Sequence, residues 1–571
     1  MKILSKDNLY IIFQIITIIL ALLLGNVISY LNISMYLILL LLILLYSNNK
    51  NYKNDRITSV FSLIFSLFFS FGNLKAIEAF ETYNLPVCIY YAVSFVGYYY
   101  LIKNILLFLY KKTKNISITK DKKKQISKKK FIILLTLLGF VLYLPYLLEF
   151  FPGITSFDTY NQLNQILGNT AYSNHHPIIH TLIIKFFFDI GYFIFKSNVI
   201  GMLFFTIFQM LFVSFTFSNV LYLLYKNNVK KLYLILVFIF YYLVPYNALY
   251  SITTYKDVLF SCIMLLFIVF LYDNKESNLN LLKRIELILL SILVCLLRTN
   301  GILVIILLLI VLFIKYFNIY KDFIICIFIG LSFSFVFKLS LNVLNIPNPS
   351  FEESLSIPLQ NIAYVVKNNG NISEEEYNEL KKIMDVKKVN ELYDVDYADP
   401  IKNMVKDYNK GYLEKNKIKF IKLWFSIGIK NINMYIKSYV YQTSGYWYHN
   451  YAVNTFASYD NYDDLQIIHN NYNAPIISKI IGIMMYLNRA FQHVFWSNAL
   501  SIYIIFYSLY YLIRKNKYRI YIYPIIFIWL SLLIATPVGY EFRYQYSIFI
   551  SFPFVLASIF IKRSSQNEKN I

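Results

Sequence analysis

Long apolar stretches with few or no charges limit the fold of this chain more than any other feature. Residues 11–31 carry no charged side chain, and residues 301–317 carry only Lys315, close to their end. A helix needs roughly 20 predominantly apolar residues to cross the hydrocarbon core of a bilayer. The stretches are continuously apolar rather than alternating, which favours helices over a membrane β-barrel. We therefore expect an all-α polytopic membrane protein.

About fourteen membrane-spanning helices are predicted. Basic residues gather in alternate loops, the distribution that the positive-inside rule assigns to the cytoplasmic face. We therefore expect a multi-pass protein of the bacterial cytoplasmic membrane with both termini in the cytoplasm. This topology requires residues 177–195 to form an outer helix beside the membrane rather than a span. The predicted spans lie near residues 9–30, 34–47, 57–72, 86–109, 131–148, 199–225, 232–247, 257–272, 284–297, 301–317, 322–343, 498–513, 519–535 and 546–562.

The spans and loops divide the chain into five predicted regions. A four-span region covers residues 1–110, and a basic cytoplasmic linker covers 111–130. The membrane core covers residues 131–343 and includes an outer loop at 149–198. A mainly helical extracytoplasmic domain at 344–497 and a three-span region with a cytoplasmic tail at 498–571 complete the chain.

Two segments of the outer domain have a helical signature. The residues from Ser373 to Glu376 match a capping box and predict the start of a helix. Residues 418–441 alternate lysines with apolar residues at helical spacing. This amphipathic helix either lies on the membrane surface or packs inside the outer domain.

The formal net charge of +23 would suggest nucleic-acid binding in a soluble protein. Here the basic residues lie in loops between spans, so we expect contacts with membrane lipids and none with nucleic acid. The sequence contains no GxxxxGK[ST], GxGxxG or HExxH motif. We therefore expect no cofactor and no metal ion. The four cysteines lie in or beside apolar segments and are expected to act as small buried hydrophobic residues.

The first outer loop holds the most informative polar residues. Asp158 is a lone carboxylate shortly after a span, and it either acts as a general base or caps a helix at 159–167. His175 and His176 precede Pro177. Two adjacent histidines at the membrane surface can bind an anion or tune a carboxylate. The alternative is a polar turn before a helix that begins with proline.

Charged residues recur at three later positions on the predicted outer face. Lys256 and Asp257 begin a span, where they either anchor it at the interface or serve a phosphate site. Arg298 stands between two spans and is expected to pair with an anionic lipid head group. Glu541 and Arg543 occupy a tight loop, where the alternative is a simple surface ion pair. Carboxylates and cations gathered beside a bilayer suit a phosphate-bearing lipid substrate.

These residues lie in motifs that resemble known families. The Asp of the first outer loop, SNHHPIIHTLI, LLRTNG and EFRYQYSIFISFP resemble the GT-C superfamily of membrane glycosyltransferases over about residues 131–562. The segments SFDTYNQLNQ, NHHPIIHT, TTYKD, LRTNG, ESLSIPLQNIA and SGYWYHN look more closely like a bacterial membrane family, domain of unknown function 6020. Many GT-C enzymes carry two acidic residues in the first outer loop. Asp158 has no acidic neighbour there, so Asp257 and Glu541 are candidates for the second carboxylate.

The GT-C resemblance implies a GT-C-like membrane core and transfer of a sugar from a polyprenyl-phosphate-linked donor to a glycan or lipid acceptor. Asp158 would remove a proton from the acceptor hydroxyl, and the nearby cations, with His176, would stabilise the leaving lipid phosphate. Two other classes remain open. A transporter or flippase of lipid-linked glycans predicts charged residues along a path through the spans. A non-catalytic scaffold for envelope assembly predicts tolerance to changes at Asp158, His176 and Arg298.

Overall fold

The computed structural model describes residues 6–24, 45, 55–72, 85–119, 126–275, 278–409, 411–448, 462–467, 478–479, 481–483, 486, 498–539 and 541–561. Every regular element within these residues is helical, apart from three isolated β-bridges. The expected all-α class is therefore confirmed for the described part of the chain.

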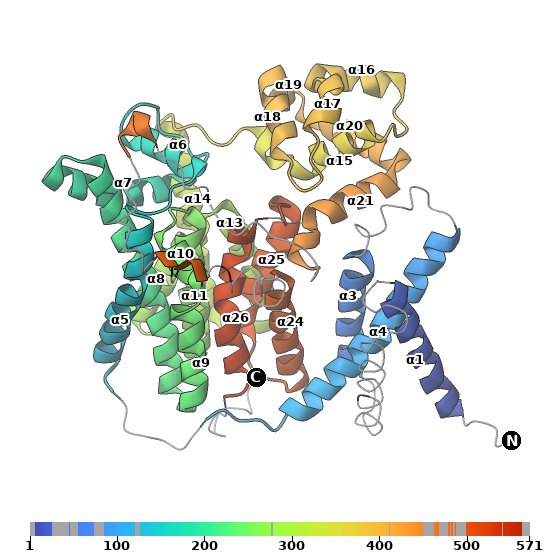
Figure 1. Ribbon diagram of the computed structural model, residues 1–571, viewed down its shortest axis with the longest axis horizontal. Helices are drawn as coiled ribbons and strands as arrows, with labels where there is room; N and C mark the ends of the chain where they lie inside the picture. The colour runs from blue at the N-terminus through green and yellow to red at the C-terminus, as the bar shows by residue number, and fades with distance from the viewer. Residues whose placement is uncertain are drawn as a thin grey trace.

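A first group of helices stands at one side of the molecule (Figure 1). It consists of α1 (Lys6–Leu24), α3 (Arg56–Gly72) and α4 (Leu85–Thr113), and α4 packs against both of the others. The predicted span at 34–47 lies outside the described residues except for residue 45.

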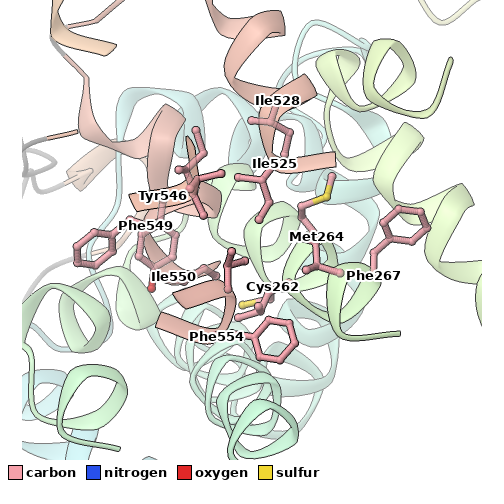
Figure 2. Close-up of a cluster of buried hydrophobic side chains, with 14 of the residues drawn as sticks. Cys262, Met264, Phe267, Ile525, Ile528, Tyr546, Phe549, Ile550 and Phe554 are labelled. Atoms are coloured by element: carbon pink, nitrogen blue, oxygen red, sulfur yellow. The ribbon is translucent and has the colours of Figure 1, made fainter. Parts of the chain in front are cut away.

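The central bundle is built around α11, and it contains α5 (Lys128–Glu149), α8 (Asn198–Lys226), α9 (Lys231–Tyr242), α10 (Pro245–Ile252), α11 (Lys256–Asp273), α12 (Leu281–Leu297), α13 (Thr299–Tyr316), α14 (Lys321–Val343), α24 (Asn498–Arg514), α25 (Tyr523–Ala535) and α26 (Tyr546–Ser558). A helix that is apolar on all sides belongs in the interior. Most residues of α11 are accordingly buried. Figure 2 shows Cys262 and Met264 of α11 facing Ile525 of α25 and Phe554 of α26.

Six described helices are long and apolar enough to cross a membrane. They are α4, α5, α7 (Ile178–Phe195), α8, α13 and α14, and the pair α9–α10, bent by 44°, makes a seventh if it is one span. These helices have the length and composition typical of a polytopic membrane protein, while the count of fourteen spans stays a prediction. By length and composition α7 is among the six, whereas the sequence predicted an outer helix there. Figure 1 draws α7 beside α6 (Phe157–Ile166), at one end of the bundle.

A separate helical unit, here called the polar domain, follows α14. It contains α15 (Ser356–Lys367), α16 (Glu374–Ile383), α17 (Val389–Leu392), α18 (Asp399–Tyr408), α19 (Tyr412–Lys415), α20 (Lys417–Lys430) and α21 (Ile432–Thr443), with the 3-10 turns η2 (Phe351–Ser354) and η3 (Val386–Lys388). These elements enclose a hydrophobic core of their own. In Figure 1 the polar domain lies beyond the same end of the bundle as α6.

Both helical signatures of the polar domain are found in the structure. Ser373 caps α16 in a capping box with Glu376, which confirms the predicted start. The amphipathic stretch 418–441 is broken at Asn431 into α20 and α21. The buried face of α20 packs into the core of the polar domain through Phe420 and Ile427, as the second alternative required. Its other face leaves apolar side chains such as Ile429 exposed.

Candidate functional site

Asp158 is the second residue of α6, and Ser156 is the residue that caps this helix. The Ser156 hydroxyl accepts a hydrogen bond from the Thr159 backbone N–H, and the Thr159 hydroxyl bonds the Ser156 backbone in return. The interpretation of Asp158 as the helix cap is therefore wrong. Its side chain is left available for other contacts.

Backbone contacts join the loop before α6 to the loop between α10 and α11. Ile154 pairs with Thr253 in an isolated bridge, in which the Ile154 N–H donates to the Ile252 carbonyl at 2.8 Å. The Thr159 hydroxyl donates to the Thr254 carbonyl at 2.8 Å. The buried Gln209 amide of α8 donates to carbonyls of this second loop, including Thr253 at 2.7 Å. These buried hydrogen bonds place Asp158 opposite the start of α11.

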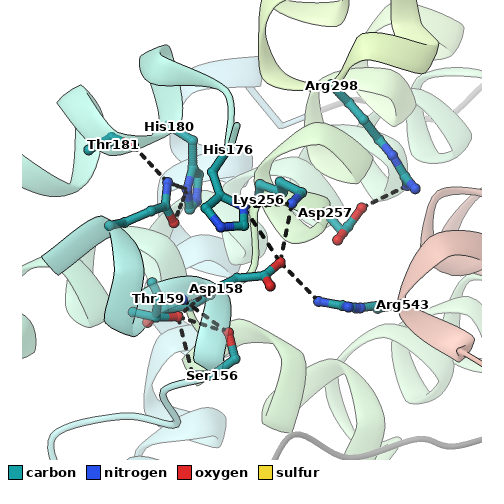
Figure 3. Close-up of polar contacts among 12 residues, drawn as sticks. Ser156, Asp158, Thr159, His176, His180, Thr181, Lys256, Asp257, Arg298 and Arg543 are labelled. Carbon is teal, nitrogen blue, oxygen red and sulfur yellow. Dashed lines mark hydrogen bonds and ion pairs between the residues drawn. The ribbon is translucent and has the colours of Figure 1, made fainter. Parts of the chain in front are cut away.

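Figure 3 shows Asp158 between two cations. Its Oδ2 atom accepts hydrogen bonds from Lys256 Nζ and from Arg543 Nη1, each at 3.2 Å. Lys256 is the first residue of α11, and Arg543 lies in the turn η7 (Phe542–Gln545) before α26. The second oxygen, Oδ1, accepts no hydrogen bond from the part of the chain that the structure describes, and the side chain is 24% exposed. One carboxylate oxygen is therefore bound to cations, and the other has no hydrogen-bond partner among the described residues.

Opposing effects act on the pKa of Asp158. Burial disfavours its charged form, but the positive charges of Lys256 and Arg543 outweigh that effect and hold the pKa well below its usual range. The carboxylate is therefore ionised at neutral pH. A carboxylate stabilised by two cations is also a weak base.

His176 completes the group around Lys256. Its Nδ1 atom lies 3.1 Å from Lys256 Nζ and 3.9 Å from Asp158 Oδ2. Burial, followed by the charge of Lys256, lowers the pKa of His176 to about 3, so the ring is neutral. An ammonium group can only donate, so Nδ1 accepts and the proton is assigned to Nε2. His175 is exposed, and its ring centroid lies 4.7 Å from that of His176, at the rim of the group.

Arg543 is held on several sides. Its Nε atom lies 3.5 Å from Glu541 Oε2, and its guanidinium lies 4.8 Å from the Tyr255 ring centroid and 4.9 Å from that of Tyr544. The Tyr544 ring is also 4.7 Å from the guanidinium carbon of Arg298. The Tyr544 ring thus lies between two guanidinium groups, and cation–π attraction to the ring stabilises both of them. Glu541 and Arg543 are therefore part of the cluster rather than an isolated surface pair.

Asp257 and Arg298 form a buried ion pair next to the Asp158 group. Arg298 Nη1 lies 2.7 Å from Asp257 Oδ1, and the two side chains are 7% and 0% exposed, respectively. Arg298 stands at the junction of α12 and α13 and turns into the protein. The structure thus pairs Arg298 with a carboxylate of the same chain, and its expected pairing with a lipid head group stays a prediction.

The structure thus gathers seven of the eight predicted site residues into two contacting groups, which the Tyr544 ring joins, and places His175 at their edge. Three negative groups, on Asp158, Asp257 and Glu541, stand against three positive groups, so the cluster has no net charge. Sequence reasoning missed two neighbours, and a signal existed for each. His180 is buried and bonded to Gln162, and it belongs to the same histidine-rich run. Tyr544 follows Arg543 directly.

Comparison with known proteins identifies the chain only at the level of a family. No curated protein and no solved structure matches it. The model of the family of unknown function DUF6020 matches residues 166–570, which is well over half of the chain and contains every cluster residue except Asp158. The match of the family model thus agrees with the resemblance of the sequence motifs to the same family. The chain belongs to the DUF6020 family.

Proposed function

We propose that this chain is an integral membrane glycosyltransferase, which transfers a sugar from a polyprenyl-phosphate donor to a cell-envelope acceptor on the outer face. The arrangement around Asp158 carries the proposal. Its Oδ2 atom is 3.2 Å from both Lys256 and Arg543, while Oδ1 accepts no hydrogen bond within the described residues. A carboxylate and two cations therefore lie within contact distance of one another, at the end of a bundle of membrane-length helices.

The two cations suit the phosphate of a lipid-linked donor. Phosphate has more acceptor oxygens than a carboxylate and binds arginine and lysine strongly, so it competes with Asp158 for Lys256 and Arg543. When phosphate takes these contacts, the positive potential at Asp158 falls and its pKa rises towards the ordinary value. Asp158 then becomes a stronger base only while the donor is bound.

The reaction that fits this geometry is a single displacement. The acceptor oxygen bonds to the anomeric carbon and gives its proton to Asp158 Oδ1. The bond between that carbon and the phosphate oxygen breaks, and its electron pair leaves with polyprenyl phosphate. Lys256 and Arg543 stabilise the charge that develops on the leaving group. Asp257 is paired with Arg298, so it is not placed to attack the anomeric carbon. The acceptor oxygen is then the nucleophile of one displacement, which inverts the anomeric configuration.

Thermal unfolding of the detergent-purified chain with a panel of polyprenyl phosphates and polyprenyl-phosphate sugars tests the phosphate subsite, since a ligand that binds only the folded state raises apparent stability. We expect stabilisation of the wild type and a smaller shift in Lys256→Gln. Asp158→Asn is expected to show a larger shift, because the variant frees both cations for phosphate.

Lys185→Gln is the matched control, because Lys185 is partly buried on α7 and pairs with Asp189 at 2.8 Å, outside the cluster. Its ligand-dependent shift should equal that of the wild type. If no lipid stabilises the wild type, or if all variants shift equally, the phosphate subsite is absent and the proposal fails. The opposite signs expected for Lys256→Gln and Asp158→Asn separate specific binding from a general effect of added lipid.

A further inference from the structure

A basic pocket lies at the other end of the bundle from Asp158. Its volume is about 360 Å³, which falls in the range of small-ligand sites. Lys114, Lys515 and Lys517 line it together with Tyr511, Ile116 and Phe560. In Figure 1, α24 and α26 end at this side of the bundle, whereas α6 stands at the opposite side. The positive-inside pattern predicts that this end is cytoplasmic.

Three separate parts of the chain build the pocket, and their backbones are fixed. The segment after α4 runs along the end of α26, where the Ile118 N–H donates to the Phe560 carbonyl at 3.3 Å. In the same segment, the Ile118 carbonyl accepts a hydrogen bond from the Lys230 N–H at 2.7 Å. The turn after α24 is closed by the Lys517 N–H, which donates to the Leu512 carbonyl at 2.9 Å. The three lysine side chains therefore extend from backbone segments that are held by hydrogen bonds.

The charge of the lining is positive. None of the lining residues is acidic. Arg514, at the end of α24, is not among the lining residues and is balanced by Asp55, with 2.6 Å between Nη2 and Oδ2. The helices α4, α24 and α26 all end at this pocket, and each C-terminus contributes about half a negative charge. Together these ends offset about half of the charge of the three lysines, so the side chains and helix ends of the lining sum to a positive charge.

We propose that this pocket binds the phosphate group of an anionic ligand, with the head group of an anionic phospholipid as its natural source. Lysine ammonium groups around a phosphate at a membrane boundary give favourable electrostatic binding. The apolar side chains of Ile116 and Phe560 and the ring of Tyr511 suit the glycerol and upper acyl region of such a lipid. This inference does not depend on the proposed sugar transfer.

Native mass spectrometry of the full-length detergent-purified chain tests this site, with phosphatidylglycerol and phosphatidylcholine offered as competing lipids. The wild type is expected to retain phosphatidylglycerol in preference. Lys515→Ala/Lys517→Ala is expected to weaken that retention by roughly tenfold or more, because two favourable charges are lost. Lys315→Ala/Lys321→Ala is the control, because it removes two exposed lysines, from the last turn of α13 and the first residue of α14, that do not line the pocket.

Equal retention in both double variants, or no preference for phosphatidylglycerol in the wild type, would overturn the proposal. Inorganic phosphate separates the two sources of the phosphate group. Displacement of the lipid by inorganic phosphate from the wild type would support a site that also takes soluble phosphates. Resistance to displacement would support a site specific for the lipid. Thermal unfolding without lipid checks that both double variants are folded.

Discussion

Lys256 Nζ lies 3.2 Å from Asp158 Oδ2, although 98 residues separate the two in sequence. The contact requires the loop before α6 to be joined to the loop before α11, and the bridge between Ile154 and Thr253 provides this connection. It also means that the proposed base is held by a cation before any substrate arrives. The account therefore makes the donor phosphate a requirement for strong basicity at Asp158.

The cap of α6 should matter for both stability and site geometry. Ser156→Ala removes the side-chain acceptor for the Thr159 N–H. Loss of such a cap costs about 1 kcal/mol. We expect a lower unfolding temperature and weaker binding of polyprenyl phosphate, since Asp158 and its contacts depend on the start of this helix. Ser156→Asp, which supplies another capping oxygen, should restore the unfolding temperature. Unchanged stability in Ser156→Ala would show that the cap is dispensable.

The buried pair of Asp257 and Arg298 should behave as a coupled unit. Removal of one partner leaves the other charge buried and unpaired, which costs about 3–5 kcal/mol. We expect Asp257→Asn and Arg298→Met each to lower the folded yield and the unfolding temperature strongly. The double variant Asp257→Leu/Arg298→Met should recover much of this loss, because no uncompensated charge remains. Additive losses in a double-mutant cycle would contradict the coupling.

The pH dependence of stability should carry a contribution from His176. Its pKa is lowered to about 3 in the folded chain, whereas an unfolded histidine titrates near 6.5. Between these values the unfolded state binds more protons, so stability falls as the pH decreases. At pH 5 this one group should cost about 2 kcal/mol relative to pH 7.5. His176→Gln should therefore show a shallower fall in unfolding temperature. Parallel curves for the two proteins would refute this assignment.

The Tyr544 ring should matter more than its hydroxyl. The ring lies between the guanidinium groups of Arg298 and Arg543, while the hydroxyl accepts one hydrogen bond from Arg543 at 3.2 Å. Tyr544→Leu removes both cation–π contacts and should cost about 1–2 kcal/mol of stability. Tyr544→Phe keeps the ring and should lose less. Chemical or thermal unfolding ranks the stability of the two variants. A larger loss of stability in Tyr544→Phe than in Tyr544→Leu would contradict the stabilising role of the ring.

Helix positions followed from the sequence more readily than side-chain partners did. Apolar runs such as 322–343 gave α14 to within a residue, because hydropathy reports burial in a membrane or a core. The capping box at Ser373 was likewise local. The true cap of α6 was missed, since its box uses Thr159 where glutamate or glutamine is usual.

Tertiary pairing explains which contacts the sequence did not predict. The topology predicted from the sequence placed the charged residues on the outer face of the membrane, and the structure brings most of them together. Whether Arg298 would meet a lipid or Asp257 depends on how α11 and α12 pack, and no local pattern reports that packing. The contacts of Asp158 with Lys256 and Arg543 likewise join three separate segments of the chain.

The most direct test of the central claim is release of polyprenyl phosphate from polyprenyl-phosphate sugars in proteoliposomes, with cell-envelope glycan as acceptor and mass spectrometry as the readout. The account predicts release by the wild type and a rate about 10²–10⁴-fold lower in Asp158→Asn, which still binds the donor. Asp189→Asn, on the exposed ion pair of α7, should match the wild type. Full activity in Asp158→Asn, or movement of intact donor across the bilayer without release, would contradict the account.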